Sequence, residues 1–432
     1  KEKTKQFTEK KSWKESFYEF LSNIFLKLNF YKFLFKFNFC IFDSRIMSNF
    51  KFFKLNLKLK NIPLTNFFFF SILEKNFKKE KSLNKKLIQN DLRLLLKKKV
   101  SRFKGDKFET FLLNILIDLF PEVYLERYNQ SLELISSYVT KKPKVIFSNY
   151  LIFYNDIYKL WVAEMVERKS ILIVSDHGGF VPLFEDPLLK HESKISDYHF
   201  IPHDFILASN NLKLPTILNI YKKKFSNLKS SNNLTFIHRE CGLYNHRLCS
   251  NIPVPNIFIE FKNFTRSIEF LEKKIKDKVR YKCINNTRAY LRQSFSKKYG
   301  DKKIINPSEV FKKTVKNSKI LVHLYIGTPF YESLHFNVPS LLLIPKGLWL
   351  FDDRFKYYLD KLEKKNILFY EAEKISEHIN KIWEKPSEWW LKEDIQSLKT
   401  KFLNVINCDD PDPVKKYYKT LQNIYKDRHE KN

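Results

Sequence analysis

The sequence predicts an α/β protein with two lobes, each built around a parallel sheet. Short apolar segments typical of buried strands alternate with helical segments over residues 106–345, as in βαβ units. A stretch with linker composition, NNLKLPTILNIYKKKFSNLKSSNN at residues 210–233, divides this alternation in two. With 432 residues, of which 44% are hydrophobic, the chain is long enough for two or three domains with their own cores.

The first region, residues 1–105, is rich in Lys, Phe and Asn and predicts a basic helical extension. Its apolar stretch at residues 21–42 carries Lys27, Lys32 and Lys36, which are costly in hydrocarbon, so we expect no transmembrane helix there. Basic-aromatic helices suit either a solvated extension or the surface of an anionic membrane. Because the chain begins with Lys rather than Met, we expect further sequence before it.

The composition is strongly basic: 79 Lys and Arg against 47 Asp and Glu give a net charge of +32. Such an excess fits nucleic acid, an anionic membrane or phosphorylated substrates, or a compositional bias towards Lys, Asn, Ile and Phe. The basic residues accompany no nucleic-acid-binding motif, so we expect no nucleic-acid partner. Five cysteines form no even-numbered disulfide framework and favour a reducing compartment. We therefore expect a cytoplasmic protein in peripheral contact with the inner face of the cytoplasmic membrane.

The second region, residues 106–225, is predicted to form the N-terminal lobe. Asp106 and Glu109 have the spacing of a capping box, and Pro121 ends the helix that follows. Apolar residues recur along this helix at amphipathic spacing, namely Phe108, Phe111, Leu112, Ile115, Leu116 and Leu119. A second helix is expected over residues 121–138 and a third over 156–168. Strands are expected at residues 144–147, 171–174 and 205–208.

The third region, residues 226–385, repeats the alternation as a C-terminal lobe. Its expected strands are residues 234–237, 279–283, 319–323 and 338–344. Its expected helices are residues 264–275, 308–317 and 329–336. The fourth region, residues 386–432, is expected to add C-terminal helices, with Trp383, Trp389 and Trp390 as apolar anchors near its start.

The first candidate site lies in ILIVSDHGGFVP, residues 171–182, where a chain with only seven glycines places two side by side. The segment follows a predicted parallel strand, and ligands bind at the carboxyl ends of such strands. Gly178 and Gly179 allow close approach of a ligand, and their N–H groups can face an anion. His177 is predicted to be a general base, because imidazole titrates near neutral pH. Asp176 either orients His177 or is the base itself; a tight turn capped by His177 is the alternative.

The second candidate site lies in KILVHLYIGTPFYESLHFNVPSLLLIP, residues 319–345. Gly327 and Thr328 fall where a helix begins, and a helix N-terminus suits a diphosphate. Glu332, one turn further on, is placed to accept hydrogen bonds from ribose hydroxyls. The alternative is an ordinary βαβ crossover in which Glu332 favours the helix dipole.

Several stretches taken in order resemble one family, the transferases of O-antigen and other surface-polysaccharide loci. They are FPEVYLERYNQ at 120–130, KVIFSN at 144–149, WVAEMVERK at 161–169, HGG at 177–179, HESKISDYHF at 191–200 and IGTPFYESLHFNVPSLLL at 326–343, followed by Arg354. The resemblance covers residues 110–405 and implies a GT-B-like architecture of two Rossmann-like lobes. A similar His-Gly element and loop-helix occur in the CDP-glycerol-type polyol-phosphate transferases of teichoic acid synthesis.

The resemblance assigns roles to residues of both lobes. On the acceptor side, His177, Gly178 and Gly179 match a Gln-His-Gly-Gly element, and His191, Glu192 and Asp197 match a His-Glu…Asp element. On the donor side, Gly327, Thr328 and Glu332 match the loop-helix, and Arg354 is expected to clamp a phosphate or carboxylate. Asp176 departs from the family, which has Gln there. The implied partners are a nucleotide-activated sugar and a polysaccharide or lipid-linked acceptor, with no metal and no cofactor.

Several alternatives stay open. His238, Cys241, His246 and Cys249 have ligand types that suit zinc, and Asp352-Asp353 resembles a metal-binding pair, although Arg354 would compete for its carboxylates. His199 and His203 are interpreted as surface or core histidines. The chain is either a glycosyltransferase-like enzyme, with polyol-phosphate transfer as the second choice, or a non-catalytic basic scaffold that retains a transferase fold.

Overall fold

The computed structural model describes most of the chain in ten segments. These are residues 38–41, 49–60, 91–138, 142–149, 151–176, 187–215, 232–239, 254–283, 290–408 and 410–429. The chain divides into two compact units. Unit 1 comprises residues 1–175, 196–198 and 414–432, and unit 2 comprises residues 176–195 and 199–413. Among the helices of the described segments, none has the length and apolar character needed to span a bilayer.

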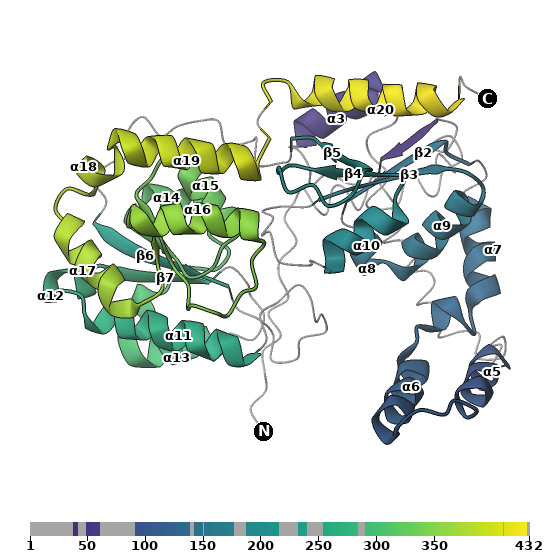
Figure 1. The fold of residues 1–432 in the computed structure, drawn as a ribbon, viewed down its shortest axis with the longest axis horizontal. Helices are drawn as coiled ribbons and strands as arrows, with labels where there is room; N and C mark the ends of the chain where they lie inside the picture. Colours follow the sequence, from purple (N-terminus) through teal and green to yellow (C-terminus); the bar gives the residue numbers. More distant parts are fainter. Residues whose placement is uncertain are drawn as a thin grey trace. The chain divides into compact units, whose positions relative to one another are not determined.

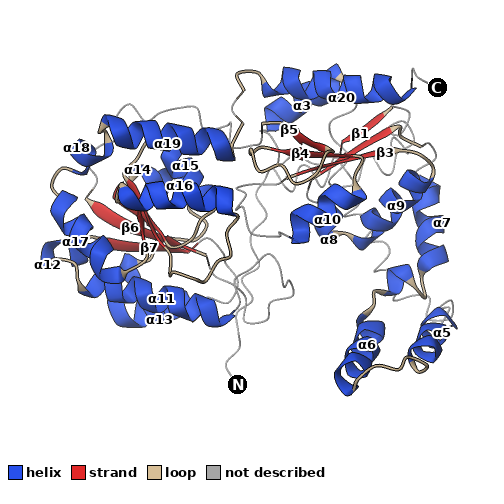
Figure 2. Cartoon of the chain, in the orientation of Figure 1, coloured by secondary structure: helices blue, strands red, loops and turns tan. Residues whose placement is uncertain are grey.

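Two parallel sheets with flanking helices confirm the predicted α/β class (Figure 2). The first sheet has the order β1-β2-β3-β4-β5, formed by Phe39–Ile41, Val145–Ser148, Ile171–Ser175, Tyr198–Ile201 and Asn211–Lys213. The second has the order β10-β9-β8-β6-β7, formed by Leu368–Phe369, Ser340–Leu343, Ser318–His323, Asn233–His238 and Val279–Cys283. Strands β2, β3 and β9 are buried along their whole length, as expected of parallel strands covered on both faces.

Unit 1 has a core between β2, β3 and the helices that follow them. Its helices are α3 (Asn49–Lys58), α5 (Asp91–Val100), α6 (Lys107–Leu119), η2 (Glu122–Tyr124), α7 (Tyr128–Tyr138), α8 (Leu151–Tyr154), α9 (Asp156–Glu167) and α20 (Pro413–His429). Trp161 and Tyr158 of α9 are fully buried and pack in one cluster with Ile146 and Leu172 of the strands. Burying two large aromatic side chains of α9 in this way fixes the helix on the sheet.

The last helix of the chain, α20, completes the core of unit 1. Tyr417 is fully buried and meets Phe147 of β2 edge to face, with ring centroids 6.0 Å apart. Tyr425 lies 5.4 Å from the ring of Phe39, and its hydroxyl accepts a hydrogen bond of 2.9 Å from Asn38. Figure 1 shows α20 running alongside α3, far from it in the sequence. Residues from both ends of the chain therefore build one core.

Unit 2 holds a larger core around the second sheet. Its helices are α10 (Pro187–Ile195), α11 (Val254–Glu269), α12 (Lys273–Lys276), α13 (Tyr290–Tyr299), η4 (Asp301–Lys303), α14 (Phe311–Lys316), α15 (Thr328–Phe336), α16 (Asp353–Lys364), α17 (Ala372–Ile382), α18 (Pro386–Trp390) and α19 (Glu393–Ile406). Figure 1 shows α11 on one face of the sheet and α15 and α16 on the other. Phe402 of α19 lies among the rings of Phe330 and Phe355, with centroids 6.3 and 5.9 Å away.

The capping box predicted for α6 is present, but the predicted apolar stripe is not buried. Glu109 N–H donates to Asp106 Oδ1 over 2.7 Å, and Asp106 N–H donates to Glu109 Oε2 over 3.0 Å. The helix ends before Pro121 as expected. Phe108 and Leu119, however, are 68% and 74% exposed, and Ile117 is the buried residue of the helix. The helix is amphipathic as predicted, and its apolar face is exposed to solvent.

Two predicted elements are wrong. Residues 205–208 are a loop rather than a strand, because Asn211 Oδ1 accepts the N–H groups of Leu207 and Ala208 over 3.0 and 3.1 Å. The edge strand of this part of the sheet is β5 instead. Residues Phe39–Ile41 lie within the predicted helical extension but form β1, which pairs with β2. Phe39 and Cys40 are buried there, and this burial favours a strand over a solvated helix.

Candidate functional site

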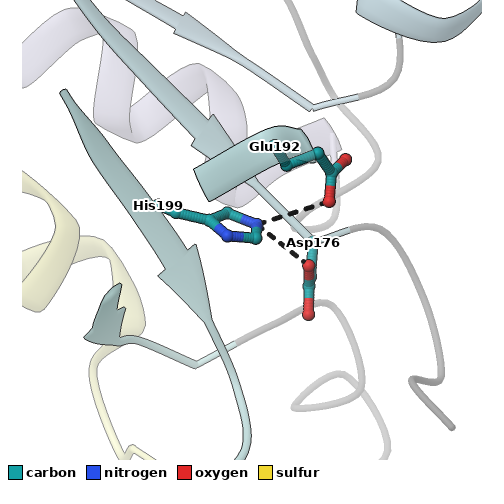
Figure 3. Close-up of side chains that lie close together, drawn as sticks. All are labelled: Asp176, Glu192 and His199. Atoms are coloured by element: carbon teal, nitrogen blue, oxygen red, sulfur yellow. Dashed lines mark hydrogen bonds and ion pairs between the residues drawn. The ribbon is translucent and has the colours of Figure 1, made fainter. Parts of the chain in front are cut away.

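Four buried residues of unit 2 form a network around Asp176. Asp176 directly follows β3, Glu192 lies on α10, His199 belongs to β4, and His203 follows β4. Their exposed fractions are 7%, 3%, 0% and 0%, respectively. Three of them converge in Figure 3, where the ring of His199 points at both carboxylates. Asp176 directly follows β3 and His203 lies two residues after β4, so both are at the carboxyl-terminal edge of a parallel sheet, where ligands bind.

The network is held by short polar contacts. His199 Nε2 lies 3.1 Å from Asp176 Oδ1 and 3.4 Å from Glu192 Oε2. His203 Nε2 lies 3.2 Å from the other Asp176 oxygen, Oδ2. Ser193 Oγ lies 2.9 Å from His199 Nδ1. Each carboxylate oxygen of Asp176 therefore faces a different imidazole, which fixes its rotamer.

The hydrogen bonds define how the network is protonated. Phe205 N–H donates to His203 Nδ1 over 3.2 Å, so the proton of His203 is on Nε2 and is donated to Asp176. Burial lowers the pKa of His199, but its hydrogen bonds to Asp176 and Glu192 outweigh burial and raise that pKa to about 9. Burial raises the pKa of Asp176, but the hydrogen bonds from His199 and His203 together bring it well below its usual range. A buried imidazolium thus lies between two carboxylates.

Asp176, Glu192 and His199 are also the group, in the described part of the chain, whose ligand atoms lie close enough to share a metal ion. Any such ion would have to displace the proton on His199 Nε2, because that atom already faces both carboxylates. With the proton in place, His199 neutralises one of the two negative charges. The absence of a metal, expected from the sequence, stays a prediction.

The other predicted acceptor-side residues are distributed differently. His177, Gly178 and Gly179 lie outside the described residues, so their roles stay predictions. His191 is exposed on α10, whereas its neighbour Glu192 is buried in the network. In unit 1, Asp197 Oδ2 accepts the N–H of Leu172 over 2.9 Å, and its other oxygen pairs with Arg428. This environment supports a structural role for Asp197.

The predicted donor-side residues lie where the strand order of the second sheet reverses. From β6 the chain passes to β7 on one side and later to β8 on the other. Ligands bind at such switch points, at the carboxyl ends of the strands. Gly327 follows β8 and precedes Thr328, the first residue of α15, whose N-terminus offers free N–H groups. Glu332 is buried one turn into the same helix.

Arg239, which was not predicted from the sequence, occupies the same switch point. It directly follows β6, and its guanidinium lies 5.2 Å from the ring centroid of Tyr325 and 5.0 Å from that of Trp349. A Cβ on Gly327 would come within 2.9 Å of the Tyr325 ring, so the glycine allows this ring its position. Burial raises the pKa of Tyr325, which keeps the ring neutral beneath the cation. An arginine held between rings beside a helix N-terminus suits a phosphate group.

Arg239 is the neighbour of His238 in the proposed zinc motif, and the structure weakens the zinc alternative. His238 is fully buried, with Nδ1 3.0 Å from Tyr281 Oη and Nε2 3.5 Å from Glu260 Oε2. The three other residues of the motif, Cys241, His246 and Cys249, lie outside the described residues. The position directly after a buried strand was the signal that could have drawn attention to Arg239.

Arg354 is anchored rather than free. Its Nε and Nη2 donate to Asp352 Oδ1 and Oδ2, both over 2.9 Å, and its guanidinium lies 5.3 Å from the ring centroid of Phe205. Both oxygens of Asp352 are thus engaged, which leaves the Asp352-Asp353 pair poorly suited to a metal. Phe205 also meets Phe355, with centroids 5.9 Å apart. The loop that carries His203 is therefore connected, within unit 2, to the helix that carries Arg354.

Two parallel sheets with flanking helices define an α/β protein whose second sheet carries a candidate anion site, formed by Arg239 after β6 and by the N-terminus of α15. The chain belongs to the LIC12162 family transferases, whose sequence profile matches residues 1–421. This confirms that the chain is a transferase and confirms the resemblance seen in the sequence. No curated protein shows significant sequence similarity to it.

Several solved structures are similar to the chain, at low identity. The wall teichoic acid polymerase TagF with CDPG has 11% identity and a TM-score of 0.38, over 68% of this chain and 75% of that one. Acinetobacter baumannii MurG has 9% identity and a TM-score of 0.39, over 70% and 78%. The S. aureus MnaA–UDP co-structure has 11% identity and a TM-score of 0.39, over 69% and 85%.

Proposed function

We propose that this transferase moves a sugar from a nucleotide-activated donor to a hydroxyl of a surface-polysaccharide acceptor, free or lipid-linked. The observation that carries the proposal is the position of Arg239, held between Tyr325 and Trp349 at the switch point of the second sheet. Two features that favour an anion, the guanidinium and the N-terminus of α15, follow adjacent strands there.

The donor diphosphate would rest on Arg239 and on the first turn of α15, beginning at Gly327 and Thr328. Glu332 would accept hydrogen bonds from the ribose hydroxyls. Charge develops on the departing diphosphate as the glycosidic bond breaks, so Arg239 would stabilise the transition state more than the ground state. Arg354, held by Asp352, would bind donor phosphate or an acceptor carboxylate.

The acceptor would be activated by His177. In the proposed step, His177 takes the proton of the acceptor hydroxyl, the oxygen bonds to the anomeric carbon, and the nucleoside diphosphate leaves with the bonding electrons. Asp176 directly precedes His177 and supports this role, because its two imidazole partners hold its carboxylate in place. A positioned base contributes roughly 100- to 10,000-fold in rate. We therefore expect His177→Ala to lose turnover by that factor while keeping donor affinity.

The proposal is tested by titrating the purified chain with UDP-, GDP- and dTDP-sugars and with CDP-glycerol. We expect one sugar nucleotide to bind, and Arg239→Ala to weaken it at least 10-fold. Arg266→Ala is the matched control, because Arg266 also stacks on a ring, that of Phe270, but lies on the last turn of α11. Selective binding of CDP-glycerol would indicate polyol-phosphate transfer instead. Salt-dependent polyanion binding with no nucleotide preference would overturn the enzyme proposal in favour of a basic scaffold.

We place this activity in the cytoplasm, in peripheral contact with an anionic membrane. A lipid-linked acceptor would be presented at that surface, and the net charge of +32 favours it. The proposal requires no nucleic acid, metal or cofactor.

A further inference from the structure

Exposed apolar side chains are concentrated in one short segment of unit 1. Of the 23 large hydrophobic residues that are exposed in the described structure, 11 lie within residues 91–120. They are Leu92, Leu94, Leu95, Phe103, Phe108, Phe111, Leu112, Ile115, Leu116, Leu119 and Phe120. Monomeric proteins rarely expose so many neighbouring apolar side chains to solvent, so this surface is expected to bind a partner.

The segment folds as a helical hairpin, α5 and α6, which we call the α5–α6 hairpin (residues 91–120). The two helices lie side by side in Figure 1 and contact one another. Leu96, Val100, Leu113 and Ile117 are less exposed than their neighbours, and these residues give each helix one sheltered face. The apolar stripe of α6 that begins at Phe108 is thus not covered by α5 and remains exposed.

Arg93 anchors the hairpin, so its apolar face is presented by an ordered structure. Its guanidinium pairs with Glu126 and donates to the carbonyl oxygens of Ile117 and Phe120. Lys97 of α5 also pairs with Asp118 of α6 over 2.6 Å. These contacts join α5, α6 and the segment that leads to α7.

The turn of the hairpin is strongly basic. Residues 97–107 contain six cations, Lys97, Lys98, Lys99, Arg102, Lys104 and Lys107, and one acid, Asp106, for a net charge of +5. The cations adjoin the apolar stripe, which starts at Phe108. An apolar helix face beside a cluster of lysines is the pattern of helices that lie in the interface of an anionic bilayer.

We propose that the α5–α6 hairpin inserts its apolar face into the boundary between headgroups and acyl chains of an anionic membrane, with the basic turn on the headgroups. A bilayer fits better than a second copy of the chain, because two turns of net charge +5 would repel one another, whereas anionic lipids neutralise them. At 13 residues α6 is about 20 Å long, too short to cross a hydrocarbon core of about 30 Å, so it lies along the surface. The inference locates the membrane contact proposed above and depends on neither donor nor acceptor.

The test is sedimentation of the full chain with vesicles of phosphatidylcholine alone or with 30% phosphatidylglycerol. The triple variant Phe108→Ser, Phe111→Ser, Leu119→Ser removes three side chains that are 60–74% exposed, so the fold should persist. We expect it to bind anionic vesicles at least 10-fold more weakly. The control Val310→Ser, Leu350→Ser changes equally exposed residues of unit 2 and should bind as the wild type does.

A second variant, Lys98→Gln, Lys99→Gln, Lys104→Gln, separates charge from apolar contact. We expect it to lose most of the preference for anionic over zwitterionic vesicles. Unchanged vesicle binding of the triple variant would overturn the proposal. The proposal would also be overturned if the wild-type chain did not bind vesicles, was dimeric by light scattering, and became monomeric in the triple variant. These results would identify a second copy of the chain as the partner of the apolar face. Nucleotide affinity of the triple variant, measured in parallel, shows whether the site proposed above is intact.

Discussion

Replacing His199 by Gln should change the pH dependence of stability in a defined direction. In the folded chain the pKa of His199 is raised to about 9, because hydrogen bonds to Asp176 and Glu192 outweigh the effect of burial. In the unfolded chain an imidazole titrates near pH 6.5. Between these two values the folded state holds a proton that the unfolded state has lost, so stability falls as the pH rises.

The magnitude follows from the two pKa values. The interval from 6.5 to about 9 corresponds to about 3 kcal/mol, fully present below pH 6.5 and lost by about pH 9. Asp176 adds no slope in this range, because its lowered pKa leaves it ionised in both states. Other groups, such as the buried Cys40 thiol, contribute above about pH 8.5, and they contribute equally in wild type and variant.

The assay is urea unfolding at half-unit intervals from pH 6 to 9.5, followed by tryptophan fluorescence. The free energy of unfolding of the wild type should fall by about 3 kcal/mol more than that of His199→Gln over this range. His191→Gln alters the exposed histidine of the adjacent helix and should retain the wild-type dependence. Parallel curves for wild type and His199→Gln would refute the buried imidazolium.

Two further predictions concern unit 2. Burial lowers the pKa of His323 to about 3. Below pH 6.5, His323 is therefore protonated in the unfolded state but stays neutral in the folded state. Acid should therefore remove up to about 4 kcal/mol of stability between pH 6.5 and 3, and His323→Gln should reduce this loss in urea titrations. Phe402→Ala should cost about 3–5 kcal/mol in the same assay, because Phe402 is fully buried against Phe330 and Phe355. The exposed Phe258→Ala should cost less than about 1 kcal/mol; equal losses would contradict the packing described.

The sequence predicted those elements whose pattern is local. The apolar runs at β3 and β7 became buried strands within a residue or two, and the Asp106–Glu109 spacing gave the observed capping box. A local pattern does not, however, predict which surface an apolar face packs against. The stripe of α6 has the period of a core helix and is nevertheless exposed, because no periodicity distinguishes a protein core from another apolar partner.

The site was predictable only in part, for the same reason. Asp176 and Glu192 were named from the sequence, but the residues that bind them, His199 and His203, were interpreted as ordinary surface or core histidines. They lie 23 and 27 residues from Asp176, and only the parallel pairing of the sheet brings them to it. Arg239 was missed because its aromatic partners, Tyr325 and Trp349, follow it by some 90 and 110 residues.

The position of α20 has a consequence for biosynthesis. The strands of unit 1 are translated before most of unit 2, whereas the buried Tyr417, which packs on Phe147 of β2, is translated after unit 2. During synthesis, the apolar surface of unit 1 that α20 covers therefore stays exposed until unit 2 has been translated. A stop codon placed directly before α20 should consequently send the truncated product to chaperones or into aggregates, although every residue of both sheets is present.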